Sequence, residues 1–290
     1  MSHVLILIAA PGALALTPSL LERVRAAAGA GAPRILSPGV AAELPCPAPP
    51  DAALVQNALS GAAVDIAILP AEGRRKRLLI ADMDSTIVTG ETLDELAAFA
   101  GVGDEVAAIT RRRMNGELDF ADALRARVAL LRGLPVDALE RTWAGVQLMP
   151  GARTLVRTMQ ANGAVTALVS GGFTWFTSRV GALCGFDVHR SNTLLDDGTV
   201  LLGQVSEPIL DRSAKLATLQ ELAAAAGLDL QDCLAVGDGA NDLDMIGAAG
   251  LGVAYRAKPI VAAQARARVV HGDLRALLYM QGYAETEFLD

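Results

Sequence analysis

LLIADMDSTIVTGE, residues 78–91, is the stretch of sequence that decides the fold. Its first four residues are apolar, and a short apolar run of this kind is typical of a parallel strand that is buried on both faces. The run leads directly into Asp82 and Asp84, so two carboxylates leave the carboxyl end of the strand. Because open α/β sheets bind ligands at that end, the stretch predicts a doubly wound parallel sheet with a functional site at these two residues.

The two carboxylates of this motif are separated by Met83 alone. If the strand continues through Met83, Asp82 and Asp84 point the same way, and two negative charges then crowd one site. A divalent cation with oxygen ligands relieves that repulsion, and Mg²⁺, which is usually held by one or two carboxylates plus substrate phosphate, fits best. The alternative is a strand followed by an ordinary Asp/Ser/Thr turn and helix cap, because these residues favour such positions.

The composition of the chain limits its class and its partners. Of its 290 residues 52% are hydrophobic and 20% are charged, so it can bury a large core and divides into about two domains. A net charge of −7 argues against binding to nucleic acid or to an anionic membrane surface. No apolar segment has the length of a transmembrane helix. We therefore expect neither nucleic acid nor a membrane as a partner.

Cysteine usage and the start of the chain indicate a cytoplasmic protein. Cys46, Cys184 and Cys233 are far apart, without CxxC spacing or the histidine partners of a zinc site, so buried free thiols are expected. The apolar stretch Val4–Leu16 has the length of a signal peptide. No Lys or Arg precedes it, however, and Pro11 and Gly12 interrupt it, so we interpret its first half as a strand.

Residues 1–73 are expected to form a small α+β domain. Strands are predicted at Val4–Ala10, Pro33–Leu36 and Val64–Leu69, with helices after Thr17 and at Asp51–Leu59. The proline-rich segment Cys46–Pro50 is expected to interrupt regular structure. This alternation loosely resembles the ACT-type modules that bind amino acids. A domain that packs without binding a ligand is the alternative. The basic run Arg74–Arg77 that follows is interpreted as a solvated lead-in to the central strand.

The segment from residue 89 to 149 is predicted to be helical. Helices are expected at Thr92–Ala100, Glu105–Met114 and Phe120–Leu131. A helical block inserted directly after a strand that carries a site can cover that site as a cap. The run Arg111–Arg113 is expected on a solvated face, with one arginine able to face the cleft.

Two later elements offer groups that bind anions. The predicted strand Ala164–Val169 ends in Ser170, Gly171 and Gly172, where a hydroxyl and unobstructed backbone N–H groups form an anion cradle. A plain glycine turn is the alternative there. Lys215 lies at the start of a predicted helix, where it is either solvated or neutralises a phosphoryl oxygen as a point charge.

The predicted strand Cys233–Val236 ends in a second acidic motif, GDGAND, at residues 237–242. Its glycines free the backbone for a tight turn, and Asp238, Asn241 and Asp242 supply oxygens of the kind that Mg²⁺ prefers. The remaining predicted elements are a hairpin at Ser191–Pro208, strands at Leu251–Ala254 and Val269–Val270, and a helix at Leu274–Met280.

These motifs, in this order, resemble the haloacid-dehalogenase superfamily of aspartate-dependent phosphohydrolases, and within it the phosphoserine phosphatase family. The resemblance covers about residues 76–280. It implies that residues 74–290 form a Rossmannoid phosphatase domain with the helical cap at 89–149. The more specific part of this resemblance lies in the cap. In that family a glutamate and an arginine at the positions of Glu91 and Arg127 hold the amino and carboxylate groups of phosphoserine, and residues equivalent to Met114 and Phe120 close over them.

The resemblance also implies a role for each motif residue. Asp82 is the nucleophile that forms an aspartyl-phosphate, and Asp84 is the general acid and then the general base. The implied Mg²⁺ site consists of Asp82, the backbone carbonyl of Asp84 and Asp238, with Asp242 orienting metal-bound waters. The implied ligands of the phosphoryl oxygens are Ser170, the Gly171 N–H, Lys215 and Asn241.

The implied reaction is hydrolysis of O-phospho-L-serine, a small-molecule substrate, in the last step of serine biosynthesis. A phosphatase for another small phosphomonoester, or a phosphotransferase, is the alternative within the same chemistry. A metal-free dehalogenase of the same fold is disfavoured, because its reaction does not use a second aspartate at the position of Asp84. A non-catalytic amino-acid sensor would not need the acid, base and metal ligands that this chain retains. A homodimer is one assembly that the sequence allows.

Overall fold

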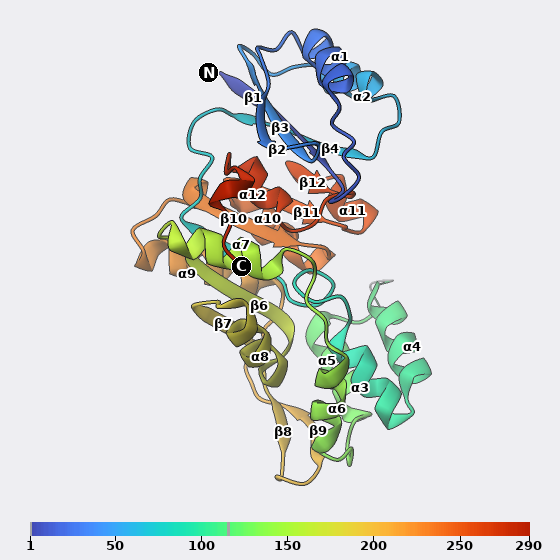
Figure 1. Ribbon diagram of the computed structural model, residues 1–290. Helices are drawn as coiled ribbons and strands as arrows, with labels where there is room; N and C mark the ends of the chain where they lie inside the picture. Colours follow the sequence, from blue (N-terminus) through green and yellow to red (C-terminus); the bar gives the residue numbers. More distant parts are fainter. Residues whose placement is uncertain (1, 115–116) are drawn as a thin grey trace.

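The computed structural model describes residues 2–114 and 117–290. Its strands form a four-stranded sheet, a six-stranded sheet and a separate two-stranded hairpin. Figure 1 shows the four-stranded sheet at one end of the molecule, the six-stranded sheet in the middle, and a group of helices beside the hairpin at the other end. The helices of the described residues are all too short or too polar to span a lipid bilayer.

Residues 3–70 form the four-stranded antiparallel sheet and two helices. The elements are β1 (His3–Ala9), α1 (Pro18–Ala28), β2 (Arg34–Ser37), β3 (Ala41–Cys46), α2 (Ala52–Leu59) and β4 (Val64–Pro70), in the sheet order β2-β3-β1-β4. The chain order βαββαβ is ferredoxin-like, which agrees with the expected ACT-like fold. Helix α1 begins where predicted, because the Thr17 hydroxyl accepts a hydrogen bond from the N–H of Leu20. The domain limit at residue 73 stays a prediction.

Strand β3 is the main departure from the prediction for this part of the chain. The sequence pattern predicts no strand before the proline-rich segment Cys46–Pro50. In the structure β3 pairs with β2 only as far as Glu43, so Pro45 lies beyond the end of β2, where no residue of that strand needs its missing N–H. The proline is therefore tolerated in a strand that is otherwise in the interior of the sheet.

The six-stranded sheet is parallel throughout and has the order β12-β11-β10-β5-β6-β7. Its strands are β5 (Leu78–Ala81), β6 (Val165–Phe173), β7 (Val188–Asn192), β10 (Cys233–Gly237), β11 (Leu251–Tyr255) and β12 (Ala267–Val269). Leu79 and Ala81 of β5 enter one core, and Leu78 and Ile80 enter another on the opposite face. Burial on both faces explains the apolar run of β5 and confirms the predicted doubly wound sheet.

Helices cover both faces of this sheet. They are α7 (Ala152–Ala161), α8 (Thr174–Cys184), α9 (Arg212–Ala225), α10 (Leu243–Ala248), α11 (Pro259–Ala262) and α12 (Ala276–Met280), with short 3-10 helices η1 (Leu230–Asp232), η2 (Ala240–Asp242) and η3 (Glu285–Glu287). Leu219 of α9 and Met245 of α10 pack on one face, and Leu155 of α7 and Phe176 of α8 pack on the other. The three cysteines are buried and free, as predicted.

The predicted hairpin at Ser191–Pro208 is shorter in the structure. Its strands are β8 (Leu194–Asp196) and β9 (Leu201–Val205), joined through a turn that contains Asp197 and Gly198. Ser191 and Asn192 instead end β7, which is an edge strand of the six-stranded sheet. Its sequence, VHRSN, lacks the apolar run that identifies buried strands, which explains why the pattern does not predict it.

The helical insertion follows β5 as expected. It contains α3 (Thr92–Ala100), α4 (Gly103–Met114), α5 (Phe120–Ala129) and α6 (Asp137–Gly145). The two linkers to the sheet are joined where the N–H of Met149 donates to the carbonyl of Ile87 at 2.8 Å. The hairpin holds the cap at a second place, because Leu201 exchanges backbone hydrogen bonds with Leu134 and Gly133. Figure 1 shows the hairpin lying alongside α5 and α6.

The four-stranded sheet docks on the rest of the chain through the face that α1 and α2 leave open. Ile6 and Ile8 of β1 share a core with Leu277 and Tyr279 of α12. The carboxylate of Asp65 on β4 is buried, and it accepts hydrogen bonds from the N–H groups of residues 270, 271 and 272 at 2.8–3.2 Å. A backbone loop after β12 therefore binds a side chain of the first sheet.

The basic run Arg74–Arg77 is only in part the solvated lead-in that the sequence suggests, because Arg75 and Arg77 are exposed while Arg74 and Lys76 are partly buried. Arg74 is only 14% exposed and pairs with Glu43 at 2.8 Å. Arg75 pairs with Glu287 and lies over the ring of Tyr283. The run therefore joins the first sheet to the end of the chain, and these acidic and aromatic partners, distant in sequence, explain why local pattern alone cannot predict it.

Candidate active site

Three parallel strands bring the predicted motifs to one place. β5, β6 and β10 are neighbours, so the residues after their carboxyl ends meet at one edge of the sheet. A cavity of about 360 Å³ lies between this edge and the cap. Its walls include most of the predicted site residues, namely Asp82, Asp84, Glu91, Phe120, Arg127, Ser170, Gly171, Asp238 and Asn241. Lys215 and Asp242 are buried beside Asp82, and the side chain of Met114 lies outside the described part of the chain.

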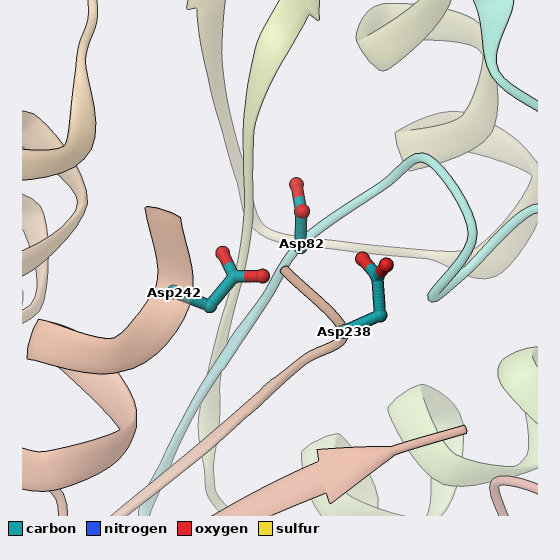
Figure 2. Close-up of side chains that lie close together, drawn as sticks. All are labelled: Asp82, Asp238 and Asp242. Atoms are coloured by element: carbon teal, nitrogen blue, oxygen red, sulfur yellow. The ribbon is translucent and has the colours of Figure 1, made fainter. Parts of the chain in front are cut away.

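Three of these residues form a buried acidic cluster. Carboxylate oxygens of Asp82, Asp238 and Asp242 lie within 4.8 Å of one another, and Figure 2 shows the three side chains side by side. Burial and the charge of Asp242 raise the pKa of Asp82 well above its ordinary value, and the same two causes raise the pKa of Asp238 to about 6. The cluster is therefore short of positive charge, and its hard oxygen donors suit a divalent cation such as Mg²⁺.

Lys215 supplies the cluster with one positive charge. Its ammonium lies 2.7 Å from Oδ1 of Asp82 and 2.6 Å from Oδ1 of Asp242, and its side chain is 1% exposed. Burial lowers the pKa of Lys215, but the two carboxylates outweigh burial and leave the pKa above its ordinary value. The other oxygen of Asp242 accepts the N–H of Gly239 at 3.0 Å. Lys215 thus fixes Asp82 and Asp242 relative to each other.

The carboxylate of Asp84 lies outside the acidic cluster, although its charge also raises the pKa of Asp82, so a cation shared by Asp82 and Asp84 stays a prediction. β5 ends at Ala81, and Ser85 has a left-handed backbone with φ of 57°, so the chain turns sharply after Asp84. The carboxylate of Asp84 accepts the N–H of Thr92 at 3.0 Å and the hydroxyl of Ser170 at 3.3 Å.

The environment of Asp84 suits proton transfer. Burial, with the negative charge of Glu91 second, raises the pKa of Asp84 to about 7. A carboxyl group with that pKa is partly protonated at neutral pH, so it can donate a proton in one step and accept one in the next. Asp82 and Asp84 therefore line one cavity in different environments, as distinct chemical roles require.

The carboxyl end of β6 is shaped by glycine. An added Cβ on Gly172 would lie 2.9 Å from Oδ2 of Asp84, and one on Gly171 would lie 3.0 Å from the ring of Phe120. The N–H of Gly172 donates to the Ser170 hydroxyl at 2.9 Å. A side chain at Gly172 would therefore meet Asp84, and one at Gly171 would meet Phe120, so both positions leave space at this edge of the cavity. The anion cradle itself stays a prediction.

The cap contributes charged groups to the opposite wall. Arg127 donates from Nε to the carbonyl of Ala123 at 3.2 Å, and Glu91 accepts the hydroxyl of Ser85 at 2.8 Å. Burial, followed by the charge of Arg113, lowers the pKa of Arg127. Among the described residues, Glu91 and Arg127 form no ion pair with each other. Both charges thus remain available to a ligand.

The structure adds residues that the sequence analysis does not assign to the site. Thr110, Asp94 and Lys258 also line the cavity. Arg113 lines it too, so one arginine of the run Arg111–Arg113 faces the cleft, as the sequence analysis allows. The Thr110 hydroxyl is buried and has no hydrogen-bond partner in the described part of the chain. Residues three or four apart share a helix face. Thr110 is four residues before Met114, and Asp94 is three residues after Glu91, so this spacing could have indicated that both face the site. Lys258, 3.9 Å from Asp238, follows β11 in a loop that carries no such signal.

The chain is similar to known proteins over the segment that contains these residues. A family model described as haloacid dehalogenase-like hydrolase matches residues 79–247. A phosphoserine phosphatase from Streptomyces coelicolor is 46% identical over 227 residues, which are 77% of this chain and 55% of that protein. A phosphoserine phosphatase from Streptococcus thermophilus is 45% identical over 199 residues, which are 69% of this chain and 93% of that protein. This chain spans about half the length of several of its curated relatives.

Solved structures show the same likeness. The crystal structure of a probable phosphoserine phosphatase from Vibrio cholerae, in unliganded form, has a TM-score of 0.81 at 33% identity and covers 99% of this chain and 88% of that one. A substrate-bound phosphoserine phosphatase complex has a TM-score of 0.66 at 38% identity and covers 70% of this chain and 97% of that one. The family match includes β5, the cap, β6 and β10 with all of their motifs, and the chain belongs to the haloacid dehalogenase-like hydrolases.

Proposed function

We propose that this chain is a Mg²⁺-dependent phosphoserine phosphatase that hydrolyses O-phospho-L-serine to serine and phosphate, the last step of serine biosynthesis. The observation that carries the proposal is the two-ended cavity. One end holds Asp82, Asp84 and the cradle at Ser170, and the cap end holds Glu91 and Arg127. A phosphate ester that also bears an ammonium and a carboxylate matches both ends, and the names of the relatives support the same substrate.

The reaction divides into two steps. A carboxylate oxygen of Asp82 attacks phosphorus, and the bond to the serine oxygen breaks as Asp84 transfers its proton to that oxygen. Asp84, now a carboxylate, takes a proton from a water molecule that attacks the aspartyl-phosphate. The P–O bond to Asp82 breaks, which releases phosphate and restores both aspartates. A pKa of about 7 for Asp84 suits both transfers.

The acidic cluster fits a magnesium ion. Asp82, Asp238 and the backbone carbonyl of Asp84 would hold it, and Asp242 would orient its waters. When bound, Mg²⁺ neutralises negative charge on the phosphoryl oxygens and on the cluster. Lys215 keeps Asp82 and Asp242 in place through its two short ion pairs.

The remaining residues bind the substrate. The Ser170 hydroxyl, the Gly171 N–H, Lys215 and Asn241 stabilise the phosphoryl oxygens. Arg127 donates two parallel hydrogen bonds to the substrate carboxylate, and Glu91 accepts a hydrogen bond from the substrate ammonium. Phe120 closes over the substrate beside the cradle.

The test measures phosphate release from O-phospho-L-serine and from a panel of small phosphomonoesters, with Mg²⁺ and with a chelator. We expect phosphoserine to give the highest kcat/KM, no turnover in chelator, and loss of turnover by many orders of magnitude in Asp82→Asn. Preference for another ester would overturn the substrate, and transfer of phosphate to an acceptor other than water would make the chain a phosphotransferase. Turnover of Asp82→Asn within about tenfold of the parent would overturn the nucleophile.

A further inference from the structure

Asn192 is buried outside the cavity, yet its side chain contacts the cradle directly. It is the last residue of β7 and is 3% exposed. Its Nδ2 donates to the carbonyl of Gly171 at 2.9 Å and to the carbonyl of Leu210 at 3.4 Å. Its Oδ1 accepts the N–H of Leu210 at 2.7 Å. One amide group therefore joins three segments of the chain.

The contact with Gly171 compensates for an irregularity in the sheet. Val169 of β6 pairs with Arg190 of β7, and the next paired residues are Phe173 and Asn192. Residues 170–172 thus bulge out of the ladder opposite the single residue Ser191. A bulge turns the cradle toward the cavity but leaves carbonyl groups without strand partners. The side chain of Asn192 supplies the missing donor to one of them.

The peptide between Gly171 and Gly172 is consequently held at both ends. Its carbonyl accepts Nδ2 of Asn192, and its N–H donates to the hydroxyl of Ser170. That hydroxyl in turn donates a hydrogen bond to Oδ2 of Asp84 at 3.3 Å. A continuous series of hydrogen bonds therefore leads from Asn192 through the cradle to the proposed general acid.

The contacts with Leu210 extend this support to a second element. Leu210 precedes Asp211, whose carboxylate caps α9 by accepting the N–H groups of Ser213 and Ala214. Lys215 lies in the first turn of that helix and contacts Asp82. Asn192 thus connects the cradle to the helix that carries the buried lysine.

We propose that Asn192 is a positioning residue, which holds the bulge at residues 170–172 and the start of α9 in the geometry that binds the phosphoryl group. This inference rests on the proposed phosphatase activity. It concerns the end of the cavity that every phosphomonoester uses, and not the cap end that selects phosphoserine. Loss of Asn192 should therefore affect all phosphomonoester substrates alike.

The test compares Asn192→Asp with the parent on O-phospho-L-serine and on p-nitrophenyl phosphate, at a temperature where both proteins are folded by circular dichroism. Aspartate keeps the shape and the acceptor for the Leu210 N–H but replaces the Nδ2 donor by an oxygen. Because a displacement of about 1 Å in a catalytic site can lower the rate about 100-fold, we expect kcat/KM to fall about 10- to 100-fold on both substrates. We also expect weaker competitive inhibition by inorganic phosphate.

Asn162→Asp is the matched control. Asn162 also donates from Nδ2 to a backbone carbonyl, that of Thr158, but at the end of α7. It should leave kcat/KM and phosphate inhibition unchanged. If Asn192→Asp is folded and hydrolyses p-nitrophenyl phosphate within about twofold of the parent, the positioning role is wrong.

Two further measurements keep the outcome decisive. Should Asn192→Asp not fold, Asn192→Ala, which buries no charge, takes its place. Failure of both variants to fold would overturn the proposal, because Asn192 would then be needed for the fold itself. Should the parent hydrolyse p-nitrophenyl phosphate but not phosphoserine, the proposed substrate fails while the Asn192 comparison stands. The shift in Tm caused by inorganic phosphate with Mg²⁺ gives a readout that needs no turnover, and an equal shift in variant and parent would also contradict the positioning role.

Discussion

Replacing Lys215 with methionine should destabilise the fold more than any ordinary lysine substitution. In the part of the chain that the structure describes, no other cation lies at ion-pair distance from Asp82 or Asp242, and all three side chains are at most 8% exposed. Methionine has a similar length, so packing changes little while the buried carboxylates lose their partner. Removing one member of a buried ion pair typically costs about 3–5 kcal/mol. We expect a loss of that size in the free energy of unfolding at pH 8 without Mg²⁺.

The loss should depend on pH, and its sign follows from the carboxylates. In the parent the pKa of Lys215 is raised, so its charge is constant at every pH below its ordinary value of 10.5. Without that charge the pKa of Asp82, which burial and Asp242 already raise, rises further. A carboxyl group with a raised pKa adds stability at low pH and loses it as the pH rises through the folded value. The deficit should therefore be smaller at pH 5 than at pH 8.

Urea unfolding at both pH values, in chelator, measures this prediction. Lys258→Met is the matched control, because Lys258 is half-exposed and its ammonium is 3.9 Å from Asp238. We expect it to change the free energy of unfolding by about 0–1 kcal/mol. Adding Mg²⁺ should restore part of the stability of Lys215→Met. A loss below about 1 kcal/mol at pH 8, or the same loss at both pH values, would refute the electrostatic reasoning.

Three further predictions concern the substrate, the metal and the first sheet. Arg127→Ala should lower kcat/KM for O-phospho-L-serine by about 30- to 5,000-fold, because a charge in the cleft loses its partner. Hydrolysis of p-nitrophenyl phosphate should barely change, and equal losses would assign Arg127 to the phosphate end or to the fold. Mg²⁺ should raise Tm more at pH 7.5 than at pH 5.5, because burial and Asp242 raise the pKa of Asp238 to about 6 and the metal must displace that proton at low pH. A shift independent of pH would contradict this site. Asp65→Ala leaves backbone N–H groups after β12 without their carboxylate, so urea unfolding should show a loss of about 3 kcal/mol or more. Asp51→Ala, which removes only an exposed helix cap, should lose about 1 kcal/mol, and similar losses in both variants would contradict a structural role for Asp65.

Features set by local pattern can be predicted from this sequence. The apolar run of β5 is long enough to identify a buried strand, and the same holds for β10 before Asp238. Since carboxyl ends of parallel strands share one edge, the meeting of Asp82 with Asp238 follows without knowledge of the tertiary contacts. The helix at Thr92–Ala100 ends where predicted because Gly101 adopts the left-handed conformation that stops a helix.

Features set by distant partners could not be predicted. The sequence places Lys215 at the start of a helix, but nothing local shows that its ammonium also forms ion pairs with both Asp82 and Asp242. The same limit explains β7, whose polar residues gain partners only at the edge of the sheet. It also explains Asp65, whose hydrogen bonds connect residues far apart in the chain.

The charge balance of the site explains why its aspartates divide into two groups. The buried cluster contains three negative charges, from Asp82, Asp238 and Asp242. Lys215 contributes one positive charge to it. The two negative charges that remain equal the charge of one divalent cation, and burial together with the charge of Asp242 raises the pKa values of both Asp82 and Asp238. Asp84 contacts Thr92 and Ser170 instead of the cluster. The raised pKa of Asp84 reflects burial first and the charge of Glu91 second. Under the proposed function, Asp82 and Asp238 would hold the metal, while Asp84, in a different environment, would supply the proton that the leaving oxygen needs.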